Sequence, residues 1–222
     1  MRELATAPVN FFSRFILSSK QRSSLLNYVK QHPDSYVGLW ETVRQLNEGY
    51  APILDSIYTA FSMSLQRTYV GKVMAQRLAS SKSTAIGQVF PRLSLIDTNK
   101  NPVVIPARRK ATYTLIDFWY ARCTACLEEF PSLTVLFDRY QTKGFDIAGI
   151  SIDKSVDIAL WKSTIKKREL NWSQYLDVAG KVTLTQLSIG YFPSNFLLDE
   201  KGIIIKKNIN PKELSEFLLK NL

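Results

Sequence analysis

Residues 117–131 read D-F-W-Y-A-R-C-T-A-C-L-E-E-F-P and contain both cysteines of the 222-residue chain. The run that leads into them, residues 113–118, is apolar enough for a buried central strand. The segment that follows, residues 124–140, is predicted to be a helix. Cys123 and Cys126 therefore stand at a strand-to-helix junction, three residues apart in the first helical turn. Side chains at this spacing lie about 5–6 Å apart, which suits a disulfide.

The position of the cysteine pair favours redox chemistry. Cys123 would lie where unpaired backbone N–H groups and the positive end of the helix dipole stabilise a thiolate, the nucleophilic form. Arg122 adds positive charge beside it. Cys126, one turn further in, would attack a mixed disulfide and release the product. Half of a metal site and an inert pair are the alternatives, but with His32 as its one histidine the chain cannot supply four zinc ligands.

Composition and charge exclude several classes of function. Hydrophobic residues make up 45% and charged residues 22%, as in ordinary globular proteins. The net charge of +10 is spread over the chain, so a solvated surface explains it better than a nucleic-acid stripe. The sequence has no glycine-rich nucleotide loop. A Ser-His-Asp triad would have to use His32, which sits in a polar turn. The longest uncharged stretch, 182–198, is broken by Gly190 and Pro193 and cannot span a membrane.

The hydrophobic pattern changes near residue 85. Before it, helical spacing predicts four helices, over about 23–32, 34–49, 52–61 and 66–79. The short polar segment 79–87 is interpreted as a linker. After it, predicted strands at 92–97, 103–105, 113–118, 145–151, 195–198 and 203–206 alternate with predicted helices at 124–140, 156–167 and 211–220. We therefore expect a helical domain over residues 1–85 and an α/β domain over residues 86–222.

Several segments resemble one known family. Residues 117–131 resemble the thioredoxin-fold active site, in the form F-W-x-x-W-C-x-x-C-x-x-E-x-P of TlpA/ResA-like thiol–disulfide oxidoreductases, the AhpC/TSA-related group. Residues 144–151 resemble the family's next strand, and residues 189–199, I-G-Y-F-P-S-N-F-L-L-D, resemble its Y-G-V-x-x-x-P-T-x-F-L-I-D. The resemblance covers about residues 86–222 and implies a thioredoxin-like fold, a central mixed sheet flanked by helices. The all-α segment before it resembles N-terminal extensions of such proteins in Bacteroidetes.

The resemblance implies catalytic roles for four residues. Cys123 attacks a disulfide, Cys126 resolves the mixed disulfide, Asp117 matches the buried acid that moves a proton at the second cysteine, and Glu129 matches a glutamate near the site. A strand-end carboxylate held by hydrogen bonds is the alternative for Asp117. An exposed helix residue is the alternative for Glu129.

Four further residues are implied to contact the substrate. Pro193 matches the family's cis-proline, whose neighbouring backbone pairs with substrate peptide, although a plain strand-entry proline is the alternative. Phe192 precedes it, Trp119 would shield the site by contact, and Arg122 precedes the first cysteine.

The chain also departs from the family pattern. Arg122 replaces the usual tryptophan, and Ala125 replaces the usual proline before the second cysteine. Phe192 stands where threonine or valine is common. These positions tune thiolate stability and the choice of partner. We expect Arg122 to lower the pKa of Cys123 and to give a more oxidising potential than that of a dedicated reductant.

Two other functions remain open from the sequence. A peroxiredoxin-like peroxidase has a related fold, but Tyr120 stands where that site has its threonine. A binding module with idle cysteines is the other, and replacing Cys123 by serine would then leave function unchanged.

Partners and compartment follow from the family rather than from the residues. The expected partners are a cysteine-containing protein substrate and a redox partner protein, with no nucleic acid, and the helical segment could form a homodimer. No cofactor is expected beyond the dithiol. Family members usually work in the periplasm or otherwise outside the cytoplasm. Residues 1–20 are not a clean signal peptide because Arg14 interrupts their apolar run, so an export signal would lie upstream or the chain is cytosolic.

Overall fold

The computed structural model describes residues 11–47, 49–106, 111–187 and 189–222. The chain divides into two compact units with the boundary between Lys82 and Ser83, and each unit has its own hydrophobic core. The absence of a clean signal peptide in residues 1–20 is a prediction that falls partly on residues 1–10, outside the described residues. In the described parts of the chain, no helix combines the length and apolar composition that crossing a membrane requires.

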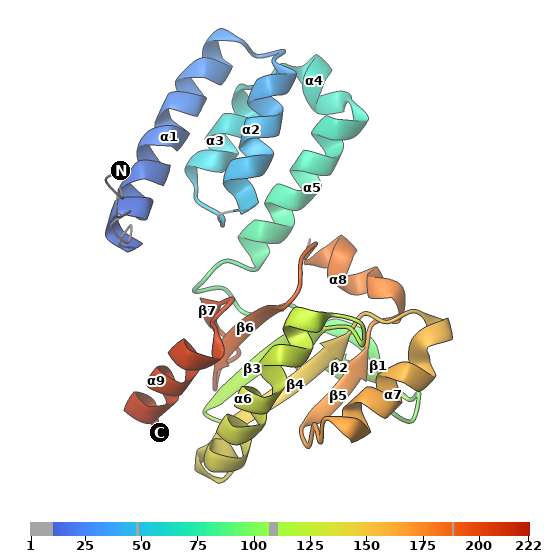
Figure 1. The fold of residues 1–222 in the computed structure, drawn as a ribbon. Coiled ribbons are helices and arrows are strands. Elements are labelled where there is room, and N and C mark those ends of the chain that lie inside the picture. Colours follow the sequence, from blue (N-terminus) through green and yellow to red (C-terminus); the bar gives the residue numbers. More distant parts are fainter. Residues whose placement is uncertain (1–10, 48, 107–110, 188) are drawn as a thin grey trace, which may run out of the picture. The chain divides into compact units, whose positions relative to one another are not determined.

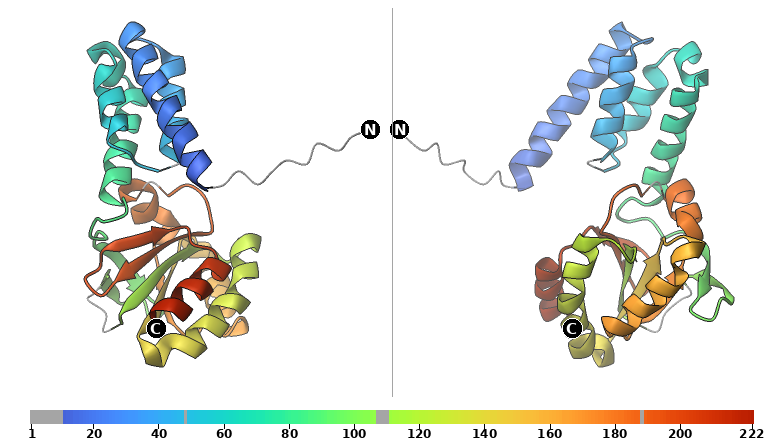
Figure 2. Two further views of the ribbon diagram at one scale, coloured as in Figure 1. Left: turned by 90° about the vertical axis from the view of Figure 1, so that its left-hand side faces the viewer. Right: turned by 45° about the vertical axis from the view of Figure 1, so that its right-hand side comes forward.

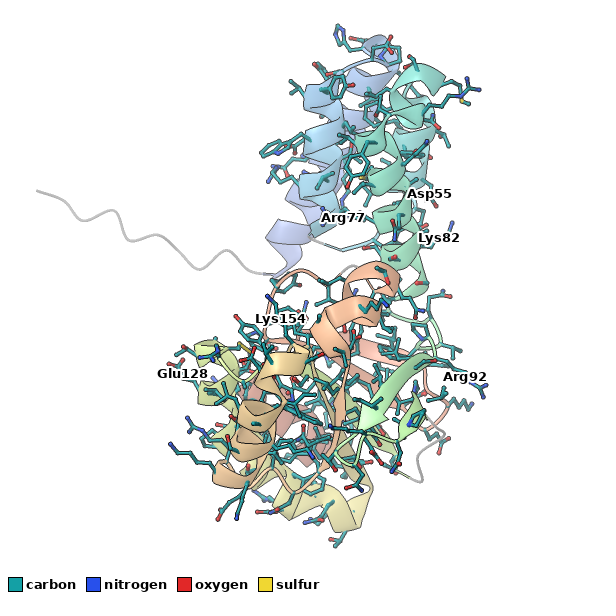
Figure 3. All side chains as sticks on the ribbon, turned by 90° about the vertical axis from the view of Figure 1, so that its right-hand side faces the viewer. Asp55, Arg77, Lys82, Arg92, Glu128 and Lys154 are labelled. Atoms are coloured by element: carbon teal, nitrogen blue, oxygen red, sulfur yellow. A yellow bond between two sulfur atoms is a disulfide. The ribbon has the colours of Figure 1, made fainter. Side chains whose placement is uncertain are left out.

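The first unit is helical throughout its described part (Figure 1). Its helices are α1 (Phe11–Gln31), α2 (Tyr36–Asn47), α3 (Ile53–Ala60), α4 (Met63–Arg67) and α5 (Tyr69–Ser83). Helix α3 buries Leu54 and Ile57 completely between its neighbours. An ion pair of 2.9 Å joins Asp55 of α3 to Lys82 near the end of α5 (Figure 3).

One predicted helix of this unit is two helices. The sequence pattern predicts a continuous helix over 66–79, but the chain breaks at Thr68, whose backbone is extended. The Thr68 hydroxyl donates to the carbonyl of Leu65 at 2.6 Å and accepts from the Gly71 N–H at 3.1 Å. It thereby serves the end of α4 and the start of α5 at once, which is the use of threonine that competes with a continuous helix. Helix α5 then continues to Ser83, so the first part of the predicted linker is helical.

The second unit contains a mixed sheet of seven strands in the order β2-β1-β5-β4-β3-β6-β7. The strands are β1 (Leu93–Asp97), β2 (Pro102–Ile105), β3 (Tyr113–Trp119), β4 (Phe145–Ser151), β5 (Ser173–Leu176), β6 (Ser194–Asp199) and β7 (Ile204–Lys207). Strand β3 is parallel to β4 and antiparallel to β6, and its last six residues are all buried. The predicted central strand is therefore confirmed.

Alternate residues of β3 face two different layers of the core. Leu115 and Trp119 belong to a cluster that also contains both cysteines and the buried residues of α6 (Thr124–Tyr140). Ile116 and Phe118 belong to a cluster on the other face. Because side chains alternate along a strand, Asp117 points to the same face as Leu115 and Trp119, the face that α6 covers.

Helices cover both faces of this sheet (Figures 1 and 2). Helices α6, α7 (Ile158–Lys167) and α9 (Pro211–Asn221) bury residues in the cluster with the cysteines. The segment of α8 (Lys181–Gln186) and the residues after it pack on the other face. The α/β class, the thioredoxin-like architecture and the helical N-terminal segment agree with the sequence-based expectation. Strand β5 and helix α8 are additions to it.

Candidate active site

The two cysteines form a disulfide at the start of α6. Their Cα atoms lie 5.3 Å apart. Cys123 is the N-cap of the helix, with an extended backbone, and its Sγ accepts a hydrogen bond of 3.2 Å from the backbone N–H of Cys126. This contact places the first sulfur in the field of the unpaired N–H groups of the helix N-terminus, as the sequence predicts.

The two sulfurs differ in access. Both cysteines are buried in the disulfide form, with 4% of Cys123 and 1% of Cys126 exposed, so Cys123 is slightly the more accessible residue. In the reduced protein, an N–H donor and the helix dipole would stabilise a negative charge on Cys123. The geometry therefore provides a nearly buried nucleophile and a second, more deeply buried thiol one helical turn away.

The loop before the cysteines is held by an aspartate that sequence reasoning missed. The carboxylate of Asp153 accepts the backbone N–H of Ala121, at 3.0 Å and 3.2 Å to its two oxygens, and the Ser151 hydroxyl at 2.6 Å. Burial raises the pKa of Asp153, although both of these hydrogen bonds oppose the rise. The sequence holds a signal for this contact: Ser151 and Asp153 stand at the end of β4. Because the carboxyl ends of neighbouring parallel strands lie together, these side chains are expected near the end of β3, where the active-site loop begins.

Arg122 lies beside Cys123 in sequence, but its positive charge is paired with the carboxylate of Asp157. Its guanidinium forms an ion pair of 3.2 Å with Asp157, and 71% of its side chain is exposed. Solvent and the aspartate both weaken the field that Arg122 exerts on the sulfur. The pKa of Cys123 is therefore expected to depend more on the helix N-terminus than on Arg122.

Asp117 is the buried acid of the site. It is 2% exposed, and its Oδ1 has no hydrogen-bond partner among the described residues. Burial, with a smaller contribution from the negative charge of Glu129, raises the pKa of Asp117 to about 7. Burial also raises the pKa of Glu129. Glu129 is half-buried on α6, whereas its neighbour Glu128 is exposed (Figure 3).

Trp119 differs from the prediction of substrate contact. Its side chain is fully buried, packs edge-to-face on Phe130 at 5.1 Å between ring centroids, and donates its indole N–H to Oε1 of Gln174 at 3.3 Å. A side chain with no exposed surface cannot touch a partner protein. Trp119 instead belongs to the layer of the core on which the cysteines rest.

Phe192 and Pro193 approach the site from a different segment. The peptide bond between them is cis, as the resemblance implies, and both are partly exposed. The Phe192 ring meets the ring of Tyr120, three residues before Cys123, edge-to-face at 5.6 Å. Phe192 also packs against the cluster that contains the cysteines. The structure thus brings the segment before β6 and the loop before α6 together.

The chain matches the model of a known protein family. Residues 86–207, more than half of the chain, match the model of the AhpC/TSA family, and the chain is therefore a member of that family. In the described residues, no group of three or more histidine, cysteine, aspartate or glutamate side chains is arranged to hold a metal ion.

Two individual proteins that resemble the chain are both thiol-disulfide oxidoreductases by name. The chain is 27% identical over 131 residues to "Thiol-disulfide oxidoreductase ResA" of Bacillus cereus, which covers 59% of this chain and 73% of the relative. Among solved structures, the thioredoxin domain of a thiol-disulfide oxidoreductase from Bacteroides vulgatus is 32% identical and covers 62% of this chain and 97% of its own, with a TM-score of 0.55.

A third comparison concerns the fold alone. A thioredoxin-like protein from Bacteroides caccae covers 92% of this chain and 78% of its own at 14% identity, with a TM-score of 0.68. The match extends beyond the α/β unit, so the combination of helical segment and thioredoxin-like unit also occurs in another solved structure.

Proposed function

We propose that this protein is a thiol–disulfide oxidoreductase that exchanges disulfides with cysteine pairs of other proteins through Cys123 and Cys126. The observation that carries the proposal is the disulfide across the first turn of α6, with the more exposed sulfur as the N-cap. The family match and the names of the relatives agree with this activity. The dithiol itself supplies the two electrons of the exchange, so the proposed reaction uses no other redox group.

The exchange proceeds in two balanced steps. In the reducing direction, the Cys123 thiolate attacks one sulfur of the substrate disulfide, forming a mixed disulfide and releasing the first substrate thiolate. The Cys126 thiol then loses its proton, and its thiolate attacks Cys123 Sγ. This closes the Cys123–Cys126 disulfide and releases the second substrate thiolate. The substrate gains two electrons and the protein loses two; the reverse sequence oxidises a substrate dithiol.

Asp117 is the proposed acceptor of the Cys126 proton. It faces the layer of the core in which Cys126 lies, and burial raises its pKa to about 7, near the operating pH of most proteins. Glu129, also with a raised pKa, is proposed to tune Asp117 through its charge and to link it toward solvent.

Phe192 and Pro193 are the proposed surface for the substrate chain. Phe192 packs on Tyr120, three residues before Cys123, and both Phe192 and Pro193 keep exposed surface. Arg122, exposed on the same loop, is proposed to contact the partner. The partners are a protein with a reactive cysteine pair and a redox protein that restores the dithiol.

The compartment and the oligomeric state are further parts of the proposal. We place the protein outside the cytoplasm, on the strength of its resemblance to TlpA/ResA-like proteins. A homodimer through the helical segment finds support in exposed apolar side chains of α2, of which Val37 and Trp40 keep 70% and 67% of their surface exposed.

The activity test is the reduction of insulin disulfides by the full chain with dithiothreitol as electron source. We expect Cys123→Ser to abolish the acceleration, because the remaining thiol, Cys126, is only 1% exposed. Reduced Cys126→Ser, mixed with insulin in the absence of dithiothreitol, should retain a single attack and accumulate a mixed disulfide, visible as a mass increase. If Cys123→Ser is as active as the unchanged protein, the cysteines are idle and the binding-module alternative replaces the proposal. Consumption of peroxide by the unchanged protein, faster than exchange with insulin, would favour the peroxidase alternative.

A further inference from the structure

Two buried polar side-chain atoms on the strands of the sheet lack hydrogen-bond partners among the described residues. One is Oδ1 of Asp117 on β3, and the other is Nε2 of Gln174 on β5. One is an acceptor and the other a donor. Buried polar atoms are normally paired, so each unpaired one calls for an explanation.

The register of the sheet puts the two side chains in one row. Asp117 is opposite Gly149 of β4, and Gly149 is opposite Gln174. Gly149 has no side chain, and the Gln174 amide occupies the space above it: a Cβ at Gly149 would lie 2.4 Å from Oε1 and 2.9 Å from Nε2. The amide therefore reaches across β4 toward β3, which is one strand spacing, about 4.8 Å, away. One bridging water spans such a gap.

The orientation of the Gln174 amide follows from its other partner. The indole N–H of Trp119, which can only donate, bonds to Oε1 of Gln174 at 3.3 Å. The oxygen of the amide is thereby occupied, and its N–H₂ group is the free end.

The other neighbour of Asp117 in its row is already engaged, and two further donors unpaired among the described residues, the indole N–H groups of Trp161 and Trp172, belong to the core cluster that contains the cysteines. Asn195 of β6, on the other side, uses its amide on the backbone N–H and carbonyl of Ile209. From the packed helices, α9 presents Leu214 and Leu218, α7 presents Trp161, and α6 presents Glu129 and the two cysteines. Of these groups, the titratable ones are Glu129 and, after reduction, the thiols. The Trp161 indole N–H is a donor as well, and Gln174 differs from it in lying in the same row of the sheet as Asp117.

We propose that Gln174 is a positioning residue for proton transfer at Asp117: its amide nitrogen, held by Trp119 over Gly149, supplies the donor that stabilises the Asp117 carboxylate before it accepts the proton of Cys126. This inference rests on the proposed function. It also gives a role to the buried Trp119, which orients Gln174 instead of contacting substrate. Because a donor favours the charged form of a carboxyl, Gln174 keeps the pKa of Asp117 lower than burial alone would set it.

The test follows the reaction of the reduced full chain with dithiobis-nitrobenzoate. The first thionitrobenzoate released reports the attack of Cys123, and the second reports the resolving attack of Cys126. In Gln174→Met and in the near-isosteric Gln174→Glu, we expect the acid limb of the second release to move up by about one pH unit, a tenfold change in proton binding. The first release should keep its rate. A carboxyl titration of Asp117 by NMR should show the same upward shift.

Three comparisons separate this role from a packing effect. Gln45→Met changes a buried glutamine in the helical unit and should leave both releases unchanged. In an Asp117→Asn background, Gln174→Glu should no longer move the pH profile, because the coupled partner is gone. If both Gln174 variants give the same profile for the second release as the unchanged protein, the assignment of Gln174 is wrong while the proposed function stands. If the unchanged protein gives neither release, the proposed function itself fails.

Discussion

The buried carboxyl of Asp117 makes folding depend on pH. Its pKa of about 7 in the folded protein exceeds the value of about 3.9 expected in the unfolded chain. Between these values the folded state holds a proton that the unfolded state has released, so stability is full below pH 4 and falls as the pH rises toward 7. A shift of about three units corresponds to a loss on the order of 4 kcal/mol.

Asp117→Asn removes this loss. In the disulfide-bonded protein, we expect the variant and the unchanged chain to be about equally stable at pH 4. At pH 8 the variant should be more stable by up to about 4 kcal/mol, because it has no carboxylate to bury. Urea unfolding at the two pH values measures the difference. Equal stabilities at pH 8 would mean that Asp117 is solvated or paired in the folded protein.

The pKa of Cys123 tests the electrostatics of the active-site loop. With its sulfur at the N-cap of α6, Cys123 in the reduced protein should titrate below about 8.5, the value of a free thiol. Arg122→Ala should raise the pKa by only a few tenths, because Arg122 is exposed and paired with Asp157. The rate of alkylation by iodoacetamide against pH gives both values. A pKa at or above 8.5 in the unchanged protein would contradict the role of the helix N-terminus.

At the scale of elements, the cysteine-bearing junction could be predicted from the sequence and β5 could not. The buried run of β3, the helix after it and the order of strands follow from hydrophobic patterning and the motif. Strand β5 buries residues 174 and 176, but the first of these is a glutamine, so its alternation is hidden. For the same reason the sequence did not predict Gln174 as part of the site. Only the strand register, which places the Gln174 amide over Gly149, shows that it faces toward Asp117.

The break between α4 and α5 gives a test at this scale. Thr68→Ala removes the hydroxyl that serves both helix ends, and we expect a loss of about 1 kcal/mol in the stability of the helical unit. Thr59→Ala is the matched control, because the Thr59 hydroxyl bonds only within its own helix. Urea unfolding followed by far-UV circular dichroism measures both. Equal losses in the two variants would show that Thr68 does not cap α5.

At the scale of the whole molecule, the sequences of the two units differ in how much they predict about function. The α/β unit carries motifs, and its family match spans 86–207. The helical unit carries only an amphipathic pattern, which predicts helices but no chemistry. Our proposed domain division remains 1–85 and 86–222. Site roles in the second unit were assigned where a motif supplied them and remain predictions, whereas Asp153 and the burial of Trp119 required the packed structure.

The central claim is that Cys123 and Cys126 form a reversible redox pair in the intact chain. The most direct measurement equilibrates the full protein in glutathione and dithiothreitol buffers and follows the fraction of disulfide by thiol labelling and mass. We predict one reversible two-electron transition with a midpoint above about −270 mV, the value typical of thioredoxin, because the helix N-terminus stabilises the reduced form as a thiolate. A protein that shows no reversible transition across these buffers would contradict the claim.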